Sequence, residues 1–260
     1  MAELRIGCSG WVYKAWVGDF YPREVKAKDR FAFYASKFDT TEINGSFYRL
    51  PSETAVARWR DQAPEGFVYA WKVSRYITHN RKLIDCADSV ALVYGRMAGL
   101  GETEGPSLIQ LPPQLRRNDE RLAAFLKLLP KGKRHTVEFR HPSWYEKPVF
   151  DLLAEHDVAL CISDHHHAPA PWETTAAFVY VRGHGPGGRY YGRYPRAELE
   201  RWAAAIAGWR RKGCDVYAYF DNDIEAAAPK DAEVLEGLTA SRPPVRSRAA
   251  SPNAGAAASR

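Results

Sequence analysis

Polar and ionisable residues stand at the C-terminal end of almost every β-type run in this chain. One set could transfer protons or bind a metal ion: Glu42, Lys72, His79, Glu138, His141, Asp164 and Asp223. A second set could hold a substrate through hydrogen bonds, charge or ring stacking: Trp11, Asn44, Arg75, Gln110, Arg140, Arg182, His184 and Asn222. Carboxylates and histidines beside arginines are typical of acid/base chemistry on a small anionic molecule.

Side-chain alternation along the strands sharpens this prediction. Glu42 and Asn44 share one face of their run, while Ile43 points the other way. Glu138 and Arg140 are related in the same way. Buried polar groups need partners, and strands that end together supply them to one another. We therefore expect the polar strand ends to converge on one cleft.

Structural roles remain open for the same residues. Glu138 and Arg140 could form an ion pair that fills the interior of the fold. Glu42 and Asn44 could organise a loop. Lys72 could neutralise a carboxylate instead of acting as a base or a nucleophile.

The histidines also have simpler interpretations. His79 could cap a helix, and His141, which precedes Pro142, could shape a turn. Residues 165–167 are adjacent histidines, which do not share a face in a strand. We interpret them as loop residues rather than metal ligands.

Two loops could bind ligands. Segment 182–191 is rich in Gly and carries Arg182 and Arg189, so its N–H groups and charges could bind phosphate. A surface loop without a ligand is the alternative. Segment 7–16 carries Trp11 and Trp16, which could stack on a base or a sugar, or close one end of the core.

Short β-type runs alternate with helical stretches through most of the chain, and these elements must position the polar residues. The predicted strands are 4–8, 40–44, 67–72, 107–111, 135–140, 158–163, 178–182 and 215–220. The predicted helices are 28–38, 53–62, 84–100, 118–129, 144–156, 195–212 and 230–238. Strands separated by helices pair in parallel, so the pattern predicts an α/β fold, a single (β/α)8 TIM-type barrel. Such barrels carry their sites at the C-terminal strand ends.

Ordered motifs resemble the YecE-like family, also called domain of unknown function 72. They are Gly7 to Trp11, Thr41 to Asn44, Phe47 to Pro51, Lys72 to His79, Gln110 to Pro113, Glu138 to Trp144 and Phe220 to Asp223. The resemblance covers about residues 4 to 240, outside the Arg-rich C-terminal segment. It implies a TIM-type barrel and no established activity. Two places depart from the family pattern: Asp221, where Asn is common, and Gly45-Ser46, where a Thr is frequent.

Charge argues against an extended nucleic-acid surface. The net charge is +6, but residues 241–260 hold four Arg and no acidic residue, so the rest of the chain is close to neutral. We expect one barrel domain over residues 1–240 and a disordered Arg-, Ala-, Ser- and Pro-containing tail over residues 241–260. With no secretory signal and no long apolar run, we expect a cytoplasmic protein with free thiols and no membrane contact.

Three functions remain open. The first is a hydrolase or isomerase acting on a small phosphorylated or polyhydroxylated substrate, with or without a divalent metal such as Mg, Mn or Zn. The second is a nucleic-acid-processing, metal-dependent barrel enzyme, which the near-neutral body does not favour. The third is a non-catalytic barrel that binds a nucleotide or another anion.

Overall fold

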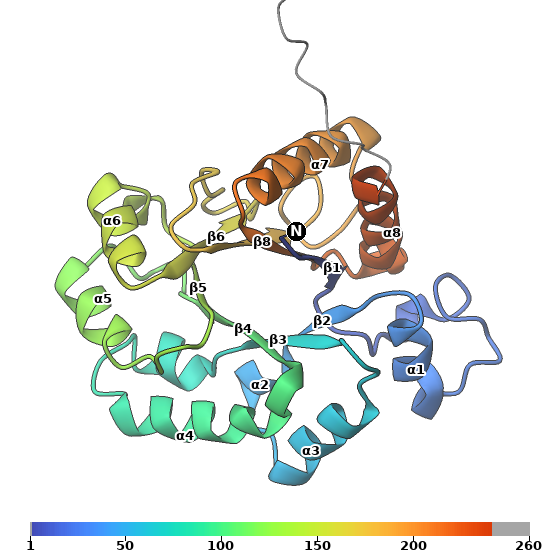
Figure 1. Ribbon diagram of the computed structural model, residues 1–260, viewed down its shortest axis with the longest axis horizontal. Helices are drawn as coiled ribbons and strands as arrows, with labels where there is room; N and C mark the ends of the chain where they lie inside the picture. The colour runs from blue at the N-terminus through green and yellow to red at the C-terminus, as the bar shows by residue number, and fades with distance from the viewer. Residues whose placement is uncertain (1, 241–260) are drawn as a thin grey trace, which may run out of the picture.

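The computed structural model describes residues 2–240, in which eight parallel strands close into a barrel in sequence order. Figure 1 shows the strands as a central ring with the helices outside it. The ring closes because β1 pairs with both β2 and β8. The predicted (β/α)8 fold is confirmed. The strands are β1 (Leu4–Cys8), β2 (Thr40–Ile43), β3 (Val68–Lys72), β4 (Glu104–Gln110), β5 (His135–Glu138), β6 (Val158–Ser163), β7 (Phe178–Gly183) and β8 (Asp215–Phe220).

Helices follow most strands and form the outer layer (Figure 1). They are α1 (Arg30–Ala35), α2 (Gly45–Tyr48), α3 (Glu53–Gln62), α4 (Ala87–Met97), α5 (Asp119–Leu126), α6 (Lys147–Glu155), α7 (Arg196–Arg211) and α8 (Ala227–Ala240). No helix stands between β6 and β7, which are joined by a loop. Helix α5 begins after Asn118, whose side chain accepts a hydrogen bond from the Arg121 N–H at 2.8 Å, as an N-cap does.

Period-two alternation divides the apolar residues into two cores. A small inner cluster includes Ala70, Leu108, Tyr180 and Tyr219. The neighbours of these residues along each strand belong to a larger cluster between strands and helices. The inner cluster fills the lower part of the barrel, so the barrel is packed rather than open. The residues two places further along each strand form the layer above it.

Several helix boundaries differ from prediction. The helix expected over 84–100 begins only at Ala87, because Asp85 has a positive φ and Cys86 has a non-helical backbone conformation. The elements that were not predicted include the short helix α2 and a single π-helical turn, Tyr76–Asn80, which follows β3. This turn carries His79 beside the strand ends.

All four cysteines are free, as predicted. Between residues 2 and 240, no helix has both the length and the apolar character needed to span a bilayer. The predicted disordered tail over 241–260 lies outside the described residues.

Candidate functional site at the C-terminal strand ends

A layer of polar side chains lies directly above the inner apolar cluster, at the C-terminal end of the barrel. Tyr217, Tyr219 and Asp221 illustrate the arrangement, since they share one face of β8 and its extension. The same alternation turns Arg182, two places after Tyr180, into the barrel. The predicted convergence of polar strand ends is therefore a feature of the structure.

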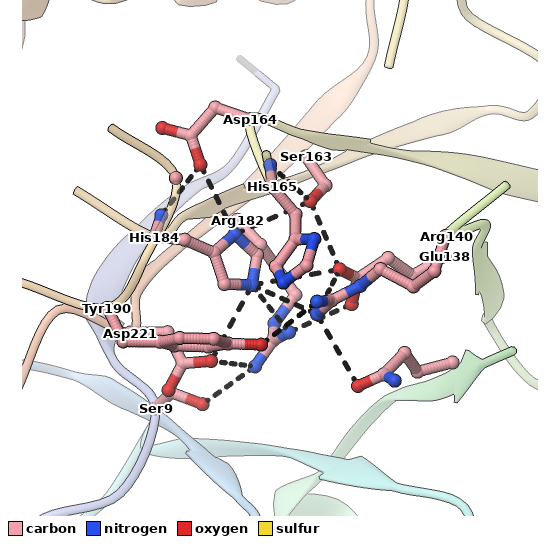
Figure 2. A network of polar contacts seen from close by, with 12 residues as sticks. Ser9, Glu138, Arg140, Ser163, Asp164, His165, Arg182, His184, Tyr190 and Asp221 are labelled. Carbon is pink, nitrogen blue, oxygen red and sulfur yellow. Dashed lines mark hydrogen bonds and ion pairs between the residues drawn. The ribbon is translucent and has the colours of Figure 1, made fainter. Parts of the chain in front are cut away.

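Arg182 is the centre of this layer and is fully buried (Figure 2). Its guanidinium forms ion pairs with three carboxylates: Glu42 at 2.7 Å, Glu138 at 2.8 Å and Asp221 at 2.8 Å. The pair with Glu42 is bidentate, because Nε also donates to that carboxylate at 3.1 Å. Nη1 in addition donates to the His184 ring at 3.1 Å. Arginine has five N–H donors, and all five have acceptors here. Arg182 therefore organises the layer and has no donor left for a substrate anion.

Glu42 is held from several strands. Tyr180, in the apolar layer below, donates its hydroxyl to the carboxylate at 2.6 Å. Ser9, at the end of β1, donates to the other oxygen. Asn44 donates to the Ser9 hydroxyl at 2.7 Å, so Glu42 and Asn44 do share a face. Both residues lie inside the barrel mouth.

Glu138 and Arg140 form a buried ion pair of 2.6 Å. Burial acts to raise the pKa of Glu138, but the charges of Arg140 and Arg182 outweigh it and hold this pKa well below its usual range. Glu138 is therefore an anion at every physiological pH. Arg140 also donates to Gln110 at 3.5 Å and to His184 at 3.2 Å, whereas its buried Nε has no hydrogen-bond partner among the described residues.

His184 has a defined tautomer. Its Nε2 faces the guanidinium groups of Arg140 and Arg182, which can only donate, so Nε2 is the acceptor. Nδ1 then carries the proton and donates to Asp164 at 3.2 Å. Burial lowers the pKa of His184 well below its usual value, which keeps the ring neutral. Burial also raises the pKa of Asp164 to about 6, although hydrogen bonds from Tyr194 and the His184 N–H oppose the rise.

The loop between β7 and α7 covers part of this network. Tyr190 places its hydroxyl 2.9 Å from Arg140 Nη1 and its ring 5.0 Å from the centre of the His184 ring. Figure 2 shows this ring beside Asp221 and His184. The Gly-rich segment thus closes over the strand ends.

Asp221 and Asp223 are acids with raised pKa values. Burial raises the pKa of Asp221 although Arg182 opposes the change. Burial and the nearby Asp221 charge raise the pKa of Asp223 to about 8. Asp223 therefore binds a proton near neutral pH. Its Oδ1 is buried without a hydrogen-bond partner among the described residues, and the neighbouring Tyr13 hydroxyl donates to the Ser9 carbonyl at 2.5 Å.

Lys72, unlike Arg140 and Arg182, has no carboxylate partner among the described residues. Its ammonium lies 4.4 Å from the centre of the Phe47 ring, and it forms no hydrogen bond or ion pair with any residue from 2 to 240. Burial, followed by the charge of Arg182, lowers the pKa of Lys72 to about 8. His79 lies against the other part of the same ring, at 5.1 Å between ring centres. Burial and the neighbouring Lys72, Arg140 and Arg75 charges lower the pKa of His79 to about 4.

Other predicted site residues lie away from the network. Trp11 packs on Phe31 and Tyr69 in the outer core, so it closes that core rather than offering a free stacking face. His141 accepts a hydrogen bond from the Ser143 N–H at 3.1 Å and shapes the turn there. Asn222 donates to the Gly192 carbonyl at 2.7 Å and to Asp231 at 2.9 Å, and so ties the β7–α7 loop to α8. Arg75 is exposed at the start of the π-helical turn.

The residues present do not fit a divalent metal at the centre of the layer. Glu42, Glu138 and Asp221 surround the Arg182 guanidinium, which takes the place that a cation would occupy between them. Within the range 2–240, no group of three or more His, Cys, Asp or Glu side chains is arranged to hold a metal ion. The histidines 165–167 belong to the β6–β7 loop, as interpreted from the sequence.

Ser9 and Asp221 stand among the polar residues at the predicted strand ends, but sequence reasoning assigned no catalytic or binding role to them or to Ser163 and Tyr190. Counting by twos from Tyr217 and Tyr219 would have assigned Asp221 to the site, and the strand-end positions of Ser9 and Ser163 would have assigned them to it. Tyr190 had no such signal, because loop conformation alone brings it to Arg140.

One known protein family matches almost the whole chain. The family model described as "Protein of unknown function DUF72" matches residues 5–254. The chain belongs to the DUF72 family. The match also corrects the expected limit of the resemblance, since it runs beyond residue 240 into the Arg-rich segment.

Relatives of this DUF72 protein agree with that assignment. The UPF0759 protein YecE of Escherichia coli K12 is 35% identical over 115 residues, which is 44% of this chain and only 42% of YecE. A DUF72 protein from Thermotoga maritima has a TM-score of 0.83 at 22% identity and covers 91% of this chain and 98% of its own. One from Enterococcus faecalis has a TM-score of 0.78 at 19% identity, with 91% and 95% covered. These solved structures support the barrel fold and assign no activity.

Proposed function

We propose that this DUF72 protein is an enzyme that acts on a small phosphorylated or polyhydroxylated substrate by acid/base chemistry at Lys72. The observation that carries the proposal is a row of hydrogen-bond donors without acceptors on three adjacent strands. They come from β3, β4 and the end of β5: Lys72, Gln110 and Arg140.

Each donor is well defined. Lys72 Nζ has no acceptor among the described residues, and Arg140 Nε is buried without one. Gln110 uses its carbonyl oxygen to accept from Arg140, which leaves its NH2 group for another partner. Of the three, Arg140 Nε is the donor that is buried without an acceptor, which costs about 1–3 kcal/mol. A ligand that supplies acceptors would recover this energy.

The chemistry of that ligand follows from the charges. The carboxylates Glu42, Glu138 and Asp221 are paired with Arg182, and Glu138 is also paired with Arg140, so none of them accepts from the Lys72 ammonium. Phosphate, carboxylate and hydroxyl oxygens are suitable acceptors, and a phosphate or carboxylate also supplies negative charge. The site therefore favours a small anion, which is also the preference expected from the sequence.

Lys72 is the group best suited to move a proton. With a pKa of about 8, about one tenth of its side chains are uncharged at pH 7. A neutral amine can take a proton from carbon next to a carbonyl, and the ammonium can return it, as in an isomerase. This favours isomerisation over hydrolysis, because the three central carboxylates are engaged by Arg182 and are poor candidates for activating water.

Proton exchange with solvent tests the proposal. Wild type, Lys72→Met and Lys37→Met would be incubated in D2O with a panel of aldose and ketose phosphates and hydroxy acids, and loss of C–H signals followed by proton NMR. Lys37 is a matched control, since it also lies over a phenylalanine ring, at 6.0 Å from Phe33, but on the surface. We expect exchange by wild type and Lys37→Met, with a rate that rises with pH to a plateau above about pH 8, and at least a hundredfold loss in Lys72→Met.

Two results would contradict the proposal. Equal exchange by wild type and Lys72→Met would remove Lys72 from the chemistry. Thermal stabilisation by panel members without any exchange would instead identify a non-catalytic anion-binding barrel.

A further inference from the structure

We propose that Lys72 acts as a nucleophile that forms an imine with a carbonyl group of the substrate. The inference rests on the proposed function for the anionic class of the substrate, and it adds that the substrate is an aldehyde or ketone. A covalent role requires an amine that is free of hydrogen bonds, close to a site for the anionic group, and shielded from bulk water.

The surroundings of Lys72 meet the first requirement. Carboxylates lie close enough to influence its charge, namely those of Glu138, Asp221 and Glu42. None of them forms an ion pair with Lys72, because all three are bound by Arg182. A lysine that merely neutralised a carboxylate would contact one. The ammonium instead rests on the face of Phe47.

The neighbouring strands meet the second requirement. Gln110 follows Leu108, which is the parallel partner of Lys72, and Gln110 is itself the partner of Glu138. Counted from this register, Gln110 is one inward-facing position and Arg140 two inward-facing positions further along the strands than Lys72, so their free donors lie nearer the barrel mouth. An anionic group bound by them would lie above the amine, with the carbonyl of a short molecule reaching down to it.

Burial meets the third requirement. Only 8% of the Lys72 surface is exposed, so bulk water has little access to its side chain. The Phe47 ring covers the ammonium on one side, and the His79 ring packs on Phe47. Desolvation favours the neutral amine, which is the nucleophilic form, and the lowered pKa of Lys72 is the consequence.

The reaction is balanced without a further reactant. The lone pair of the neutral amine attacks the carbonyl carbon, the C=O π bond breaks, and a proton moves from nitrogen to oxygen to give a carbinolamine. The C–O bond then breaks, and the oxygen leaves as water with the second nitrogen proton. One C=N bond replaces one C=O bond, and no electrons are gained or lost. In the protonated imine, the hydrogens on the adjacent carbon become more acidic; the nitrogen has no free lone pair at this stage, so a water molecule or a second base takes the carbon proton.

Borohydride trapping tests the imine. The full chain would be mixed with glycolaldehyde phosphate near pH 7, reduced with sodium borohydride and analysed by intact mass and peptide mapping. Wild type, Lys37→Met, Lys72→Met and Lys72→Arg would be compared, since Lys72→Arg keeps the charge and cannot form a lysine imine. Circular dichroism would check that each variant is folded.

We expect a single adduct on Lys72 in wild type and Lys37→Met, formed at least about tenfold faster than on the exposed Lys37 of wild type. Glycolaldehyde without phosphate should label Lys72 more slowly, and inorganic phosphate should protect Lys72 but not Lys37. Adducts spread over surface lysines, with no preference for Lys72, would overturn the inference.

The two proposals fail differently. If Lys72 is not trapped while deuterium exchange persists and is lost in Lys72→Met, Lys72 acts only by proton transfer and the imine is wrong. If Lys72 is trapped selectively but no panel member is exchanged, the imine stands and the proposed isomerisation is wrong.

Discussion

Arg182 shows how one buried side chain determines the state of several others. Its guanidinium holds three carboxylates that come from β2, β5 and the end of β8. At close range, carboxylates without a cation between them would repel one another and raise each other's pKa. With Arg182 present, Glu138 remains charged. The sequence suggested that Arg182 binds a substrate, whereas its contacts indicate a role in organising the site.

Replacement of Arg182 should therefore be costly. Arg182→Met leaves buried carboxylates without their cation, and we expect the free energy of unfolding to fall by at least about 3–5 kcal/mol in urea denaturation. Arg182→Lys, which keeps one charge but fewer donors, should lose less. Arg196→Met removes an exposed arginine that pairs with Glu200, and it should leave stability nearly unchanged. Similar stability of Arg182→Met and Arg196→Met would show that the central network contributes little.

Asp164 should make stability depend on pH. Its pKa is raised to about 6 in the folded chain, from an ordinary value near 3.8. As the pH rises from about 4 to 6, the unfolded chain releases this proton before the folded chain does, so the free energy of unfolding should fall, by about 1–3 kcal/mol. Asp164→Asn should lose this part of the pH dependence in denaturation measured at pH 4, 5, 6 and 7. Parallel pH profiles for wild type and variant would contradict the assignment.

At the scale of elements, two irregular segments add side chains to the site that the strands do not supply. The π-helical turn after β3 brings His79 against Phe47, beside Lys72. Such turns often occur at functional sites. The β7–α7 loop brings Tyr190 over Arg140 and is attached to the β6–β7 loop, since the His166 N–H donates to the Gly188 carbonyl at 3.2 Å.

Gly188 should be required for this attachment. It has a φ of +64°, and a Cβ there would lie 2.4 Å from the Asp164 carbonyl oxygen. Gly188→Ala should therefore displace the loop and raise hydrogen exchange at the Tyr190 amide by about tenfold or more, measured by mass spectrometry. Gly187→Ala is the matched control, because a Cβ at Gly187 meets open space. Equal exchange in both variants would show that the loop tolerates the added carbon.

At the scale of the whole molecule, barrel closure gathers residues from the entire chain into one layer. Glu42 and Arg182 are 140 positions apart and form the best-bonded pair of the site. The net charge is concentrated outside the barrel, since four of the six net positive charges belong to residues 241–260. The net charge of residues 1–240 is therefore close to zero.

Any nonspecific affinity for nucleic acid should accordingly depend on residues 241–260. Full-length chain and a variant ending at Ala240 would be titrated with fluorescent duplex DNA at low and moderate salt. We expect weak, salt-sensitive binding by the full chain and at least tenfold weaker binding by the shortened one. Equal, salt-sensitive binding by both would point to a basic surface on the barrel and would revive the nucleic-acid-enzyme hypothesis.

Much of the architecture was predictable because it follows local rules. Alternation of two along a strand determines which residues share a face, so Glu42 with Asn44 and Glu138 with Arg140 could be assigned to the interior from the sequence. The boundaries of the helix expected over 84–100 were less accurate, because the positive φ value at Asp85 has no clear sequence signal. Trp11 and His141 follow predicted strands but do not join the polar network. Trp11 packs on Phe31 in the outer core, and His141 is held in a turn by the Ser143 N–H.

The sequence by itself determined the barrel, the end that carries the polar residues and the face that each strand turns inward, since these follow from periodicity and chain order. Only the tertiary structure decided the partners. Arg182 pairs with three carboxylates, while Lys72 is left without one. The stagger of strands around a closed ring sets which layer each residue joins. That stagger is a property of the whole ring, and no local stretch of sequence encodes it.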